Sequence, residues 1–363
     1  VRPALRMFDR ALADHCGRSF LDVFKIGYAF LTTPTADAGV SPVDLGVLQP
    51  TEMVSTDDRI WLMSQRSEDP QDGCELARVD PLTGATSTTP LPTCAFNGVA
   101  GDDGALYFET ATIAPDSLTH EIRIVKVDAA TGAAQTLDPI AMRVEGTASG
   151  HTQLAYADGS LWLWGTVEGS SEIHEVSTQT GEVERVITNA PAIGGTEPVM
   201  AATPGQLWLA GGPGVPPTLA RLDTTTGSLT NGPSLAADAP GTVEWLASRG
   251  NEVDVGVLGT GLTGTTPRSH IVAVATDGSV LHNVEVDDVG GQVVATSGTL
   301  WTLMASSHCE HIVLSWIDTS TFTPVRIHSF PGSAPCTASG PRHLAAVGPH
   351  VFVLDQGLYR VTL

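Results

Sequence analysis

Polar residues that can bind ligands or transfer protons recur at a fixed place in this chain. Most lie nine residues before a hydrophobic residue, usually aromatic, that follows a turn. The residues at this place are Glu52, Asn97 (with one residue inserted), Gln153, Glu244, Gln292 and His343, and in the fourth copy Val199 holds the place with Glu197 two residues before it. Because their register is shared, we expect these side chains to converge on one ligand-binding site.

The chemistry available to such a set is ligand or cation binding. Carboxylates that converge repel one another, so at least one pKa rises unless a cation lies among them. Oxygen ligands of this kind suit Ca²⁺ or Mg²⁺ better than zinc. The sequence predicts Glu52 and Glu244 as metal ligands and His343 as a candidate catalytic base. The alternative is a water-filled channel whose polar lining only satisfies main-chain groups.

A second polar segment, Ser307–His311, is a weaker candidate. On a strand, His308 and Glu310 point to one face while the next residues of the segment point to the other, so no single ion reaches them all. The chain has no GxSxG, HExxH or P-loop motif, which leaves hydrolase, zinc-protease and nucleotide-binding functions without a sequence signal. Its net charge of -22 argues against a nucleic-acid partner, since phosphate binding needs a basic surface.

An internal repeat sets the register of the polar residues. A turn, an aliphatic residue and an aromatic residue recur at spacings of 46, 55, 46, 45, 48 and 51 residues, counted between positions 61, 107, 162, 208, 253, 301 and 352, of which Val253 belongs to a degenerate copy. About 20 residues after most of these marks comes a strand that ends in a turn, such as Val79–Gly84. In such turns Gly supplies a positive φ, and Asp or Thr side chains bond to nearby amides. The period is that of a four-stranded propeller blade.

The predicted fold is therefore an all-β, seven-bladed propeller of antiparallel blades over residues 43–363, in which the polar residues surround one mouth of the central channel. The last unit has only three strands. The segment Val43–Leu48 is expected to supply its outer strand, because pairing of the two ends removes an exposed sheet edge. Residues 1–42 are expected to form a leader, either a short helix or strand or a tether.

Two motifs resemble known propeller repeats. The copies Asp103–Glu109 and Asp158–Leu163 resemble the blade signature of streptogramin-lyase-like propellers, and the Val-Asp-x-x-Thr-Gly turns resemble YVTN-type repeats. The resemblance covers residues 43–363 and implies architecture only. The lyase-like relatives use a histidine and carboxylates around a magnesium ion, and this chain has no residue-by-residue match to that set.

The cysteines predict two disulfides. Cys74 begins the third strand of the first blade and Cys94 follows its fourth strand, and Cys309 and Cys336 hold the same two places in the sixth blade. Neighbouring antiparallel strands bring such pairs together. Disulfides imply an oxidising compartment, so the expected location is extracellular or the cell surface. Cys16 is left over.

The connections between second and third strands predict a binding face. The segments Ser64–Gly73, Thr110–Glu121 and Leu258–Ser269 are long, and the other connections are shorter, so the rim is uneven. Irregular loops on a rigid scaffold usually carry binding. The leading hypothesis is a non-enzymatic propeller that binds a protein or extended ligand. The alternatives are a metal-assisted lyase or hydrolase at the channel mouth, and a structural scaffold subunit. No apolar run is long enough to span a membrane.

Overall fold

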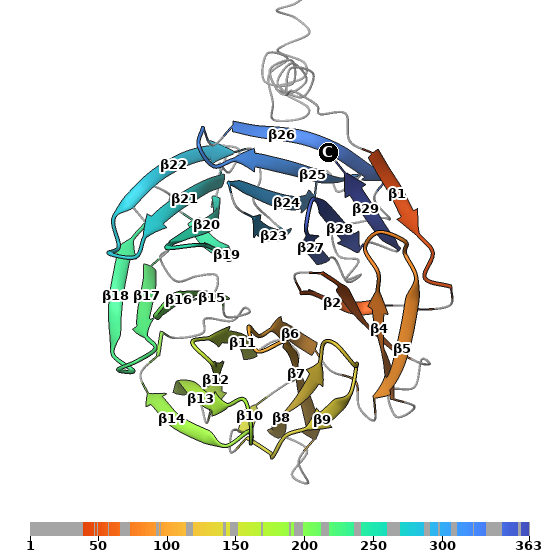
Figure 1. Ribbon diagram of the computed structural model, residues 1–363. Coiled ribbons are helices and arrows are strands. Elements are labelled where there is room, and N and C mark those ends of the chain that lie inside the picture. The colour runs from red at the N-terminus through yellow and green to blue at the C-terminus, as the bar shows by residue number, and fades with distance from the viewer. Residues whose placement is uncertain are drawn as a thin grey trace, which may run out of the picture.

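The computed structural model shows a ring of seven blades around a central axis (Figure 1). It describes residues 39–46, 48, 50–56, 58–65, 73–91, 94, 96–113, 119–140, 143–145, 152–167, 170–188, 190–191, 199–211, 218–235, 241–259, 269–286, 291–296, 298–305, 311–321, 323–331, 343–354 and 357–362. Every regular element in these residues is a β-strand. The all-β class and the seven blades are confirmed.

Each blade is an antiparallel sheet of four strands. Blade 1 contains β2 (Pro50–Ser55), β3 (Ile60–Gln65), β4 (Cys74–Val79) and β5 (Thr86–Leu91); blade 2 contains β6 (Phe96–Ala100), β7 (Ala105–Ile113), β8 (Thr119–Asp128) and β9 (Ala134–Thr136). Blade 3 contains β11 (Thr152–Ala157), β12 (Ser160–Val167), β13 (Ser170–Ser177) and β14 (Val183–Thr188); blade 4 contains β15 (Val199–Thr203), β16 (Gln206–Ala210), β17 (Thr218–Asp223) and β18 (Leu229–Ser234). Blade 5 contains β19 (Gly241–Arg249), β20 (Glu252–Gly259), β21 (Ser269–Ala275) and β22 (Val280–Val286); blade 6 contains β23 (Gly291–Thr296), β24 (Thr299–Ala305), β25 (His311–Asp318) and β26 (Thr323–Pro331). Blade 7 contains β27 (His343–Val347), β28 (His350–Leu354), β29 (Leu358–Thr362) and β1 (Gly39–Val43).

The first strand of each blade is the innermost strand, as the sequence predicts. The inner strands β2, β6, β11, β15, β19, β23 and β27 follow one another around the axis (Figure 1). A short additional strand, β10 (Arg143–Glu145), pairs with both β8 and β12 and so joins blades 2 and 3. The residues at the start of each inner strand therefore share one end of the channel.

The ring is closed by pairing of the two ends of the propeller. Strand β1 pairs antiparallel with β29, from Gly39 opposite Thr362 to Val43 opposite Leu358. Closure by an N-terminal strand is confirmed, but the predicted bounds of Val43–Leu48 are wrong. The strand ends at Val43 because a turn follows, in which Asp44 Oδ1 accepts the Gly46 amide at 2.9 Å and Gly46 has a φ of 62°.

The turns between third and fourth strands have the predicted chemistry. In blade 1, Asp80 Oδ1 accepts hydrogen bonds from the Thr83 amide at 2.8 Å and the Thr83 hydroxyl at 2.9 Å. Gly84 follows with a φ of 72°. Asp128 and Asp223 make the same contacts with the threonine three residues later. These hydrogen bonds lower the pKa of all three carboxyls.

Basic side chains join successive blades. The residue of the third strand opposite the buried aromatic is basic in blades 1, 2, 4 and 7, and each of these side chains donates to a carbonyl in the corresponding turn of the next blade. The pairs are Arg78 with Ala130 at 2.9 Å, Lys126 with Thr178 at 3.1 Å, Arg221 with Thr276, and Arg360 with Leu82 at 2.6 Å. Lys126 and Arg221 also stack on the aromatic ring that they face. Four of the chain's 18 basic residues thus link successive blades.

Blade 5 departs from this pattern. Asp254 takes the place of the aromatic residue and is fully buried, with its Oδ2 atom 3.1 Å from Arg249 Nε. The aromatic ring comes instead from Trp245 on the inner strand, which packs on Gly256, where a Cβ atom would lie 2.2 Å from the indole. The pairing of β19 with β20 shifts between Val243 and Trp245, so Glu244 is the extra residue of a β-bulge.

Candidate functional site

Five of the predicted polar residues line one cavity at the mouth of the channel. The cavity has a volume of about 720 Å³, and the predicted residues among its lining are Glu52, Asn97, Gln153, Gln292 and His343. They come from the inner strands of blades 1, 2, 3, 6 and 7. The regular pairing of inner and second strands, for example Gln153 with Trp164, places them at one height.

Two predicted residues are not part of this set. Glu244 is not among the residues that line the cavity. The count that selected it began at Val253, but Asp254 takes the place of the aromatic residue, so the equivalent inner-strand residue is Trp245 and Glu244 stands in the bulge next to it. Glu197 lies outside the described residues. Within the described part of the chain, no three His, Cys, Asp or Glu residues are grouped so that they could hold a metal ion. The Ca²⁺ or Mg²⁺ site of Glu52 and Glu244 stays a prediction.

His343 and Glu52 form a pair across the junction of blades 7 and 1. The Nδ1 atom of His343 lies 3.3 Å from Oε1 of Glu52, and Nε2 lies 3.2 Å from the carbonyl oxygen of Thr51. Both partners are hydrogen-bond acceptors, so the ring is held between two acceptors. Burial raises the pKa of Glu52, and the charge of His343 and the amides of Met53 and Asn97 partly oppose this rise.

Glu109 is a site residue that the sequence analysis missed. It is fully buried, and its carboxylate accepts hydrogen bonds from the Thr152 hydroxyl at 2.5 Å and from Asn97 Nδ2 at 3.1 Å. Burial raises its pKa to about 7. The equivalent residues of the other blades are apolar or glycine: Met63, Trp164, Ala210, Gly256, Leu303 and Leu354. This contrast is the signal by which Glu109 could have been found.

Asn97 connects the buried carboxyl to the cavity. It has a φ of 49° and stands where the pairing of β6 with β7 shifts. Its Nδ2 atom donates both to Glu109 and, at 2.9 Å, to the carbonyl oxygen of Thr152. Because both partners accept, the nitrogen must be the inner end of the amide, and Oδ1 is left as the end toward the cavity. The contacts from His343 through Glu52, Asn97 and Glu109 to Thr152 thus join blades 7, 1, 2 and 3.

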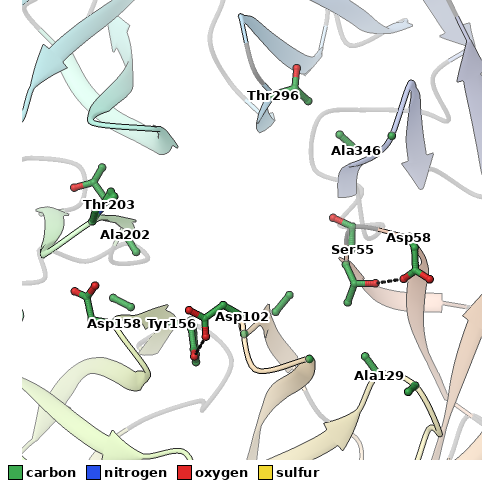
Figure 2. Close-up of a pocket in the computed structure, with 18 residues that line it drawn as sticks. Ser55, Asp58, Asp102, Ala129, Tyr156, Asp158, Ala202, Thr203, Thr296 and Ala346 are labelled. Atoms are coloured by element: carbon green, nitrogen blue, oxygen red, sulfur yellow. Dashed lines mark hydrogen bonds between the residues drawn. The ribbon is translucent and has the colours of Figure 1, made fainter.

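The opposite mouth of the channel is also polar, but its acids make structural contacts. This mouth has a volume of about 900 Å³ and is lined mainly by turns between first and second strands, with Ala129 from the turn between β8 and β9 (Figure 2). Asp102 accepts a hydrogen bond from the Tyr156 hydroxyl, and Asp158 accepts one from Thr224 at 2.5 Å. The two cavities share the lining residues Ala100, Tyr156 and Ala202, so the channel runs through the ring.

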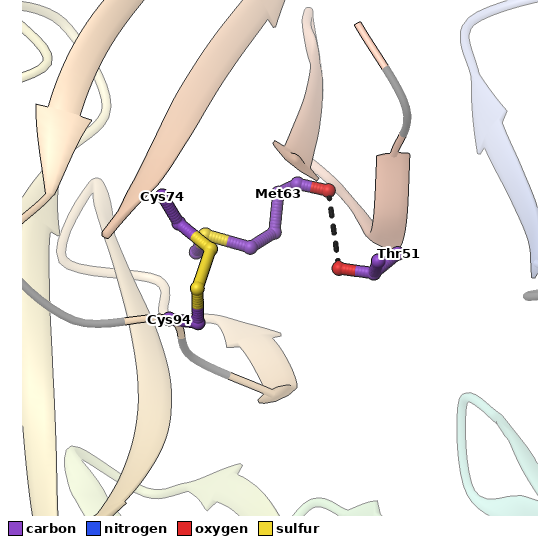
Figure 3. The surroundings of a disulfide bond; sticks show 4 residues. All are labelled: Thr51, Met63, Cys74 and Cys94. Carbon is purple, nitrogen blue, oxygen red and sulfur yellow. Dashed lines mark hydrogen bonds between the residues drawn. A yellow bond between two sulfur atoms is a disulfide. The ribbon is translucent and has the colours of Figure 1, made fainter. Parts of the chain in front are cut away.

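A disulfide lies close to the polar mouth. Cys74 and Cys94 are bonded with an S–S distance of 2.00 Å, next to Met63 (Figure 3). The carbonyl oxygen of Met63 accepts a hydrogen bond from Thr51 at 3.4 Å, and Thr51 precedes Glu52 in β2. The first predicted disulfide is confirmed. Cys16, Cys309 and Cys336 lie outside the described residues, as do His308, Glu310 and most of Ser64–Gly73 and Leu258–Ser269. The predicted connection Thr110–Glu121 is wrong in its bounds, since β7 runs to Ile113 and β8 begins at Thr119.

Solved structures share the fold of this chain. A putative 6-phosphogluconolactonase from Bacteroides uniformis has a TM-score of 0.56 at 12% identity and covers 82% of this chain and 89% of its own. The WD40 domain of Neurospora crassa Pan2 has a TM-score of 0.53 at 9% identity and covers 90% and 94%. An acylaminoacyl peptidase from Pyrococcus horikoshii has a TM-score of 0.54 at 10% identity and covers 86% and 52%.

These likenesses show the propeller architecture alone, because propellers of such low identity carry unrelated functions. No protein-family model matches the sequence, and no curated protein matches it. The resemblance to streptogramin-lyase-like and YVTN-type repeats thus holds for the blade architecture, and no specific family is assigned. Among the described residues there is no helix that could cross a membrane.

Proposed function

We propose that this protein is a non-enzymatic binding propeller whose ligand occupies the polar mouth of the channel. The observation that carries the proposal is the buried contact of Glu109 with Asn97 and Thr152. A buried carboxyl costs free energy, and the other six blades fold with an apolar residue or glycine at that place. Glu109 fixes the orientation of the Asn97 amide, as a binding site that uses this amide would require.

Binding accounts for the geometry of His343 better than catalysis does. A general base needs a ring nitrogen with a lone pair that can reach the substrate. Both ring nitrogens of His343 already face acceptors, Glu52 on one side and the carbonyl oxygen of Thr51 on the other. In this arrangement the pair is a fixed wall of the cavity.

The ligand is proposed to be a protein or an extended molecule that lies across this face. The connections that follow Gln65, Ile113 and Gly259 leave the sheets at the same end as the polar mouth. We propose that these connections carry the binding, because segments that join the strands of a rigid scaffold usually do so. We also propose an extracellular or cell-surface location, which the Cys74–Cys94 disulfide supports because such bonds persist in oxidising compartments.

Crystal soaking tests the proposed site without assuming the chemical class of the ligand. Crystals of the protein are soaked with a mixed set of small cations, anions and neutral polar molecules. We expect at least one class to bind in the mouth in contact with Glu52 or Gln153. Binding only at other surfaces, with the mouth filled by water under every condition, would overturn the proposal.

The alternative, an enzyme with His343 as acid or base, has one specific observation in its favour, the 3.3 Å contact between His343 and Glu52. Carboxylate–imidazole pairs of this kind orient and activate catalytic histidines. A compound that binds in the mouth would then be converted by the wild-type protein and not by His343→Gln. Unchanged recovery of each bound compound supports the non-enzymatic function.

A further inference from the structure

We infer that the polar mouth recognises an organic cation, an ammonium or guanidinium group carried either by a small amine or by a lysine or arginine side chain of a partner. The inference rests on the proposed function and names the chemical class of its ligand. It is based on the hydrogen-bonding groups that the cavity presents, on its apolar walls and on the charge of the protein.

Hydrogen-bond acceptors dominate the cavity. The amide of Asn97 is held with its nitrogen inward by Glu109 and Thr152, so its oxygen is the end toward the cavity. Gln153 adds an Oε1 atom that is buried and has no hydrogen-bond partner among the described residues. A buried acceptor without a donor is unfavourable, and a donor-rich ligand would satisfy it. Glu52 supplies a carboxylate on the same side of the ring.

Positive charge is scarce at this mouth. His343 directs both ring nitrogens at protein acceptors, and within the described residues no lysine or arginine lines the cavity. The whole chain carries 40 acidic and 18 basic residues, so the long-range field also favours a cation. This field and the acceptors of the cavity would repel an anionic ligand. No lysine or arginine among the described lining residues could pair with its charge.

The walls below the polar groups fit an aliphatic stem. Val99, Ala100, Ala202, Val293 and Val294, which are partly exposed, line the cavity beside the polar residues. Lysine and arginine side chains combine a charged head with methylene groups that pack on such surfaces. A volume of about 720 Å³ is ample for a side chain of this size.

Isothermal titration calorimetry with three ligands of equal length tests the inference: n-butylammonium, butyrate and n-butanol. We expect butylammonium to bind at least about tenfold more tightly than the other two, since a hydrogen bond to a charged group contributes more than a neutral one. Butyrate or butanol binding as tightly as butylammonium would overturn the inference.

Variants place the binding at the mouth. Glu52→Gln is expected to weaken butylammonium about tenfold, and Gln153→Met, which removes the buried acceptor without a charge change, should also weaken it. The matched control is Glu184→Gln, the same change on an exposed residue of the outer strand β14, with unchanged affinity expected. Equal affinity in all variants would overturn the inference.

Two further experiments distinguish the source of the cation from a failure of the proposed site. An acetylated, amidated peptide with one lysine, compared with its norleucine analogue, shows whether the cation comes from a polypeptide. Tighter binding of the lysine peptide than of butylammonium supports a partner side chain, and equal binding supports a small amine. If butyrate or butanol occupies the mouth in crystals and butylammonium does not, the cation inference fails and the proposed function stands. If the mouth stays empty of all ligands, the proposed function fails as well.

Discussion

His343 Nδ1 lies 3.3 Å from Glu52 Oε1, and this contact joins the innermost strand of the last blade to that of the first. The same junction is tied at its periphery by Arg360, which donates to the carbonyl oxygen of Leu82 at 2.6 Å. The outer strand of blade 7 is β1, which precedes β2 in the chain. The candidate site therefore depends on closure of the ring as well as on the inner strands.

The first prediction concerns the pH dependence of stability through Glu109. Its pKa is raised to about 7 in the folded protein, above its ordinary value of 4.5. The folded state then binds more protons than the unfolded state between these values, so this group's contribution to stability falls as the pH rises from about 5 to 7. In Glu109→Gln this contribution is absent. The free energy of unfolding of the variant, relative to wild type, should therefore rise by roughly 2–3 kcal/mol from pH 5 to pH 8.

Urea unfolding of the two proteins at several pH values measures this difference. Burial raises the pKa of Glu109, and the hydrogen bonds from Thr152 and Asn97 oppose the rise. Arg123 on β8 pairs with Glu121 at 2.8 Å. The same curve for Arg123→Met serves as the control. A difference between Glu109→Gln and wild type that is constant with pH would show that Glu109 titrates like an ordinary carboxyl.

The second prediction concerns the basic side chains that join blades. Arg221 stacks on Trp208 and donates to the carbonyl oxygen of Thr276 in blade 5. Arg221→Met keeps the methylene stem and removes both contacts, so we expect a loss of about 1–2 kcal/mol in the free energy of unfolding. Arg123→Met, which removes an exposed ion pair with Glu121, should cost less than about 0.5 kcal/mol. Equal losses for the two variants in urea unfolding would argue against a role in joining blades.

The third prediction concerns the ion pair that replaces the aromatic residue of blade 5. Arg249→Met leaves the carboxylate of Asp254 buried and unpaired, which should cost about 3–5 kcal/mol. The double variant Arg249→Met with Asp254→Leu removes both charges and should recover most of that loss. Chemical unfolding of wild type and of the single and double variants measures these free energies of unfolding. A double variant as unstable as the single one would mean that packing of Asp254, and not its charge, determines the cost.

Much of the fold could be predicted because its information is local. The contacts of Asp80 with Thr83 and the positive φ of Gly84 lie within five residues, so each turn motif marks its own strand pair. The register of the inner strands follows from short hairpins of constant length. Where the aromatic mark is missing the prediction fails: in blade 5 Asp254 takes its place, so a count from Val253 selected Glu244 and not Trp245.

Contacts between blades were not predictable in the same way. Thr152 donates to Glu109 from another blade, and nothing in either local sequence encodes that approach. The comparison of equivalent positions still singles out Glu109, because a charge there breaks a pattern that the fold alone would keep apolar. The start of the closing strand was misplaced for a related reason: Val43 pairs with Leu358, at the far end of the chain.

The last prediction concerns closure of the ring by β1. Deletion of residues 1–43 removes this strand and leaves the edge of β29 unpaired, which favours aggregation and weakens the junction between blades 7 and 1. Deletion of residues 1–38 keeps the strand and is the matched control. We expect the shorter deletion to melt like the full chain. The longer one should melt at a lower temperature, elute as larger species in size-exclusion chromatography, and lose ligand binding at the mouth, since Glu52 and His343 meet across that junction. If the two truncated proteins melt and elute alike, β1 does not close the ring in solution.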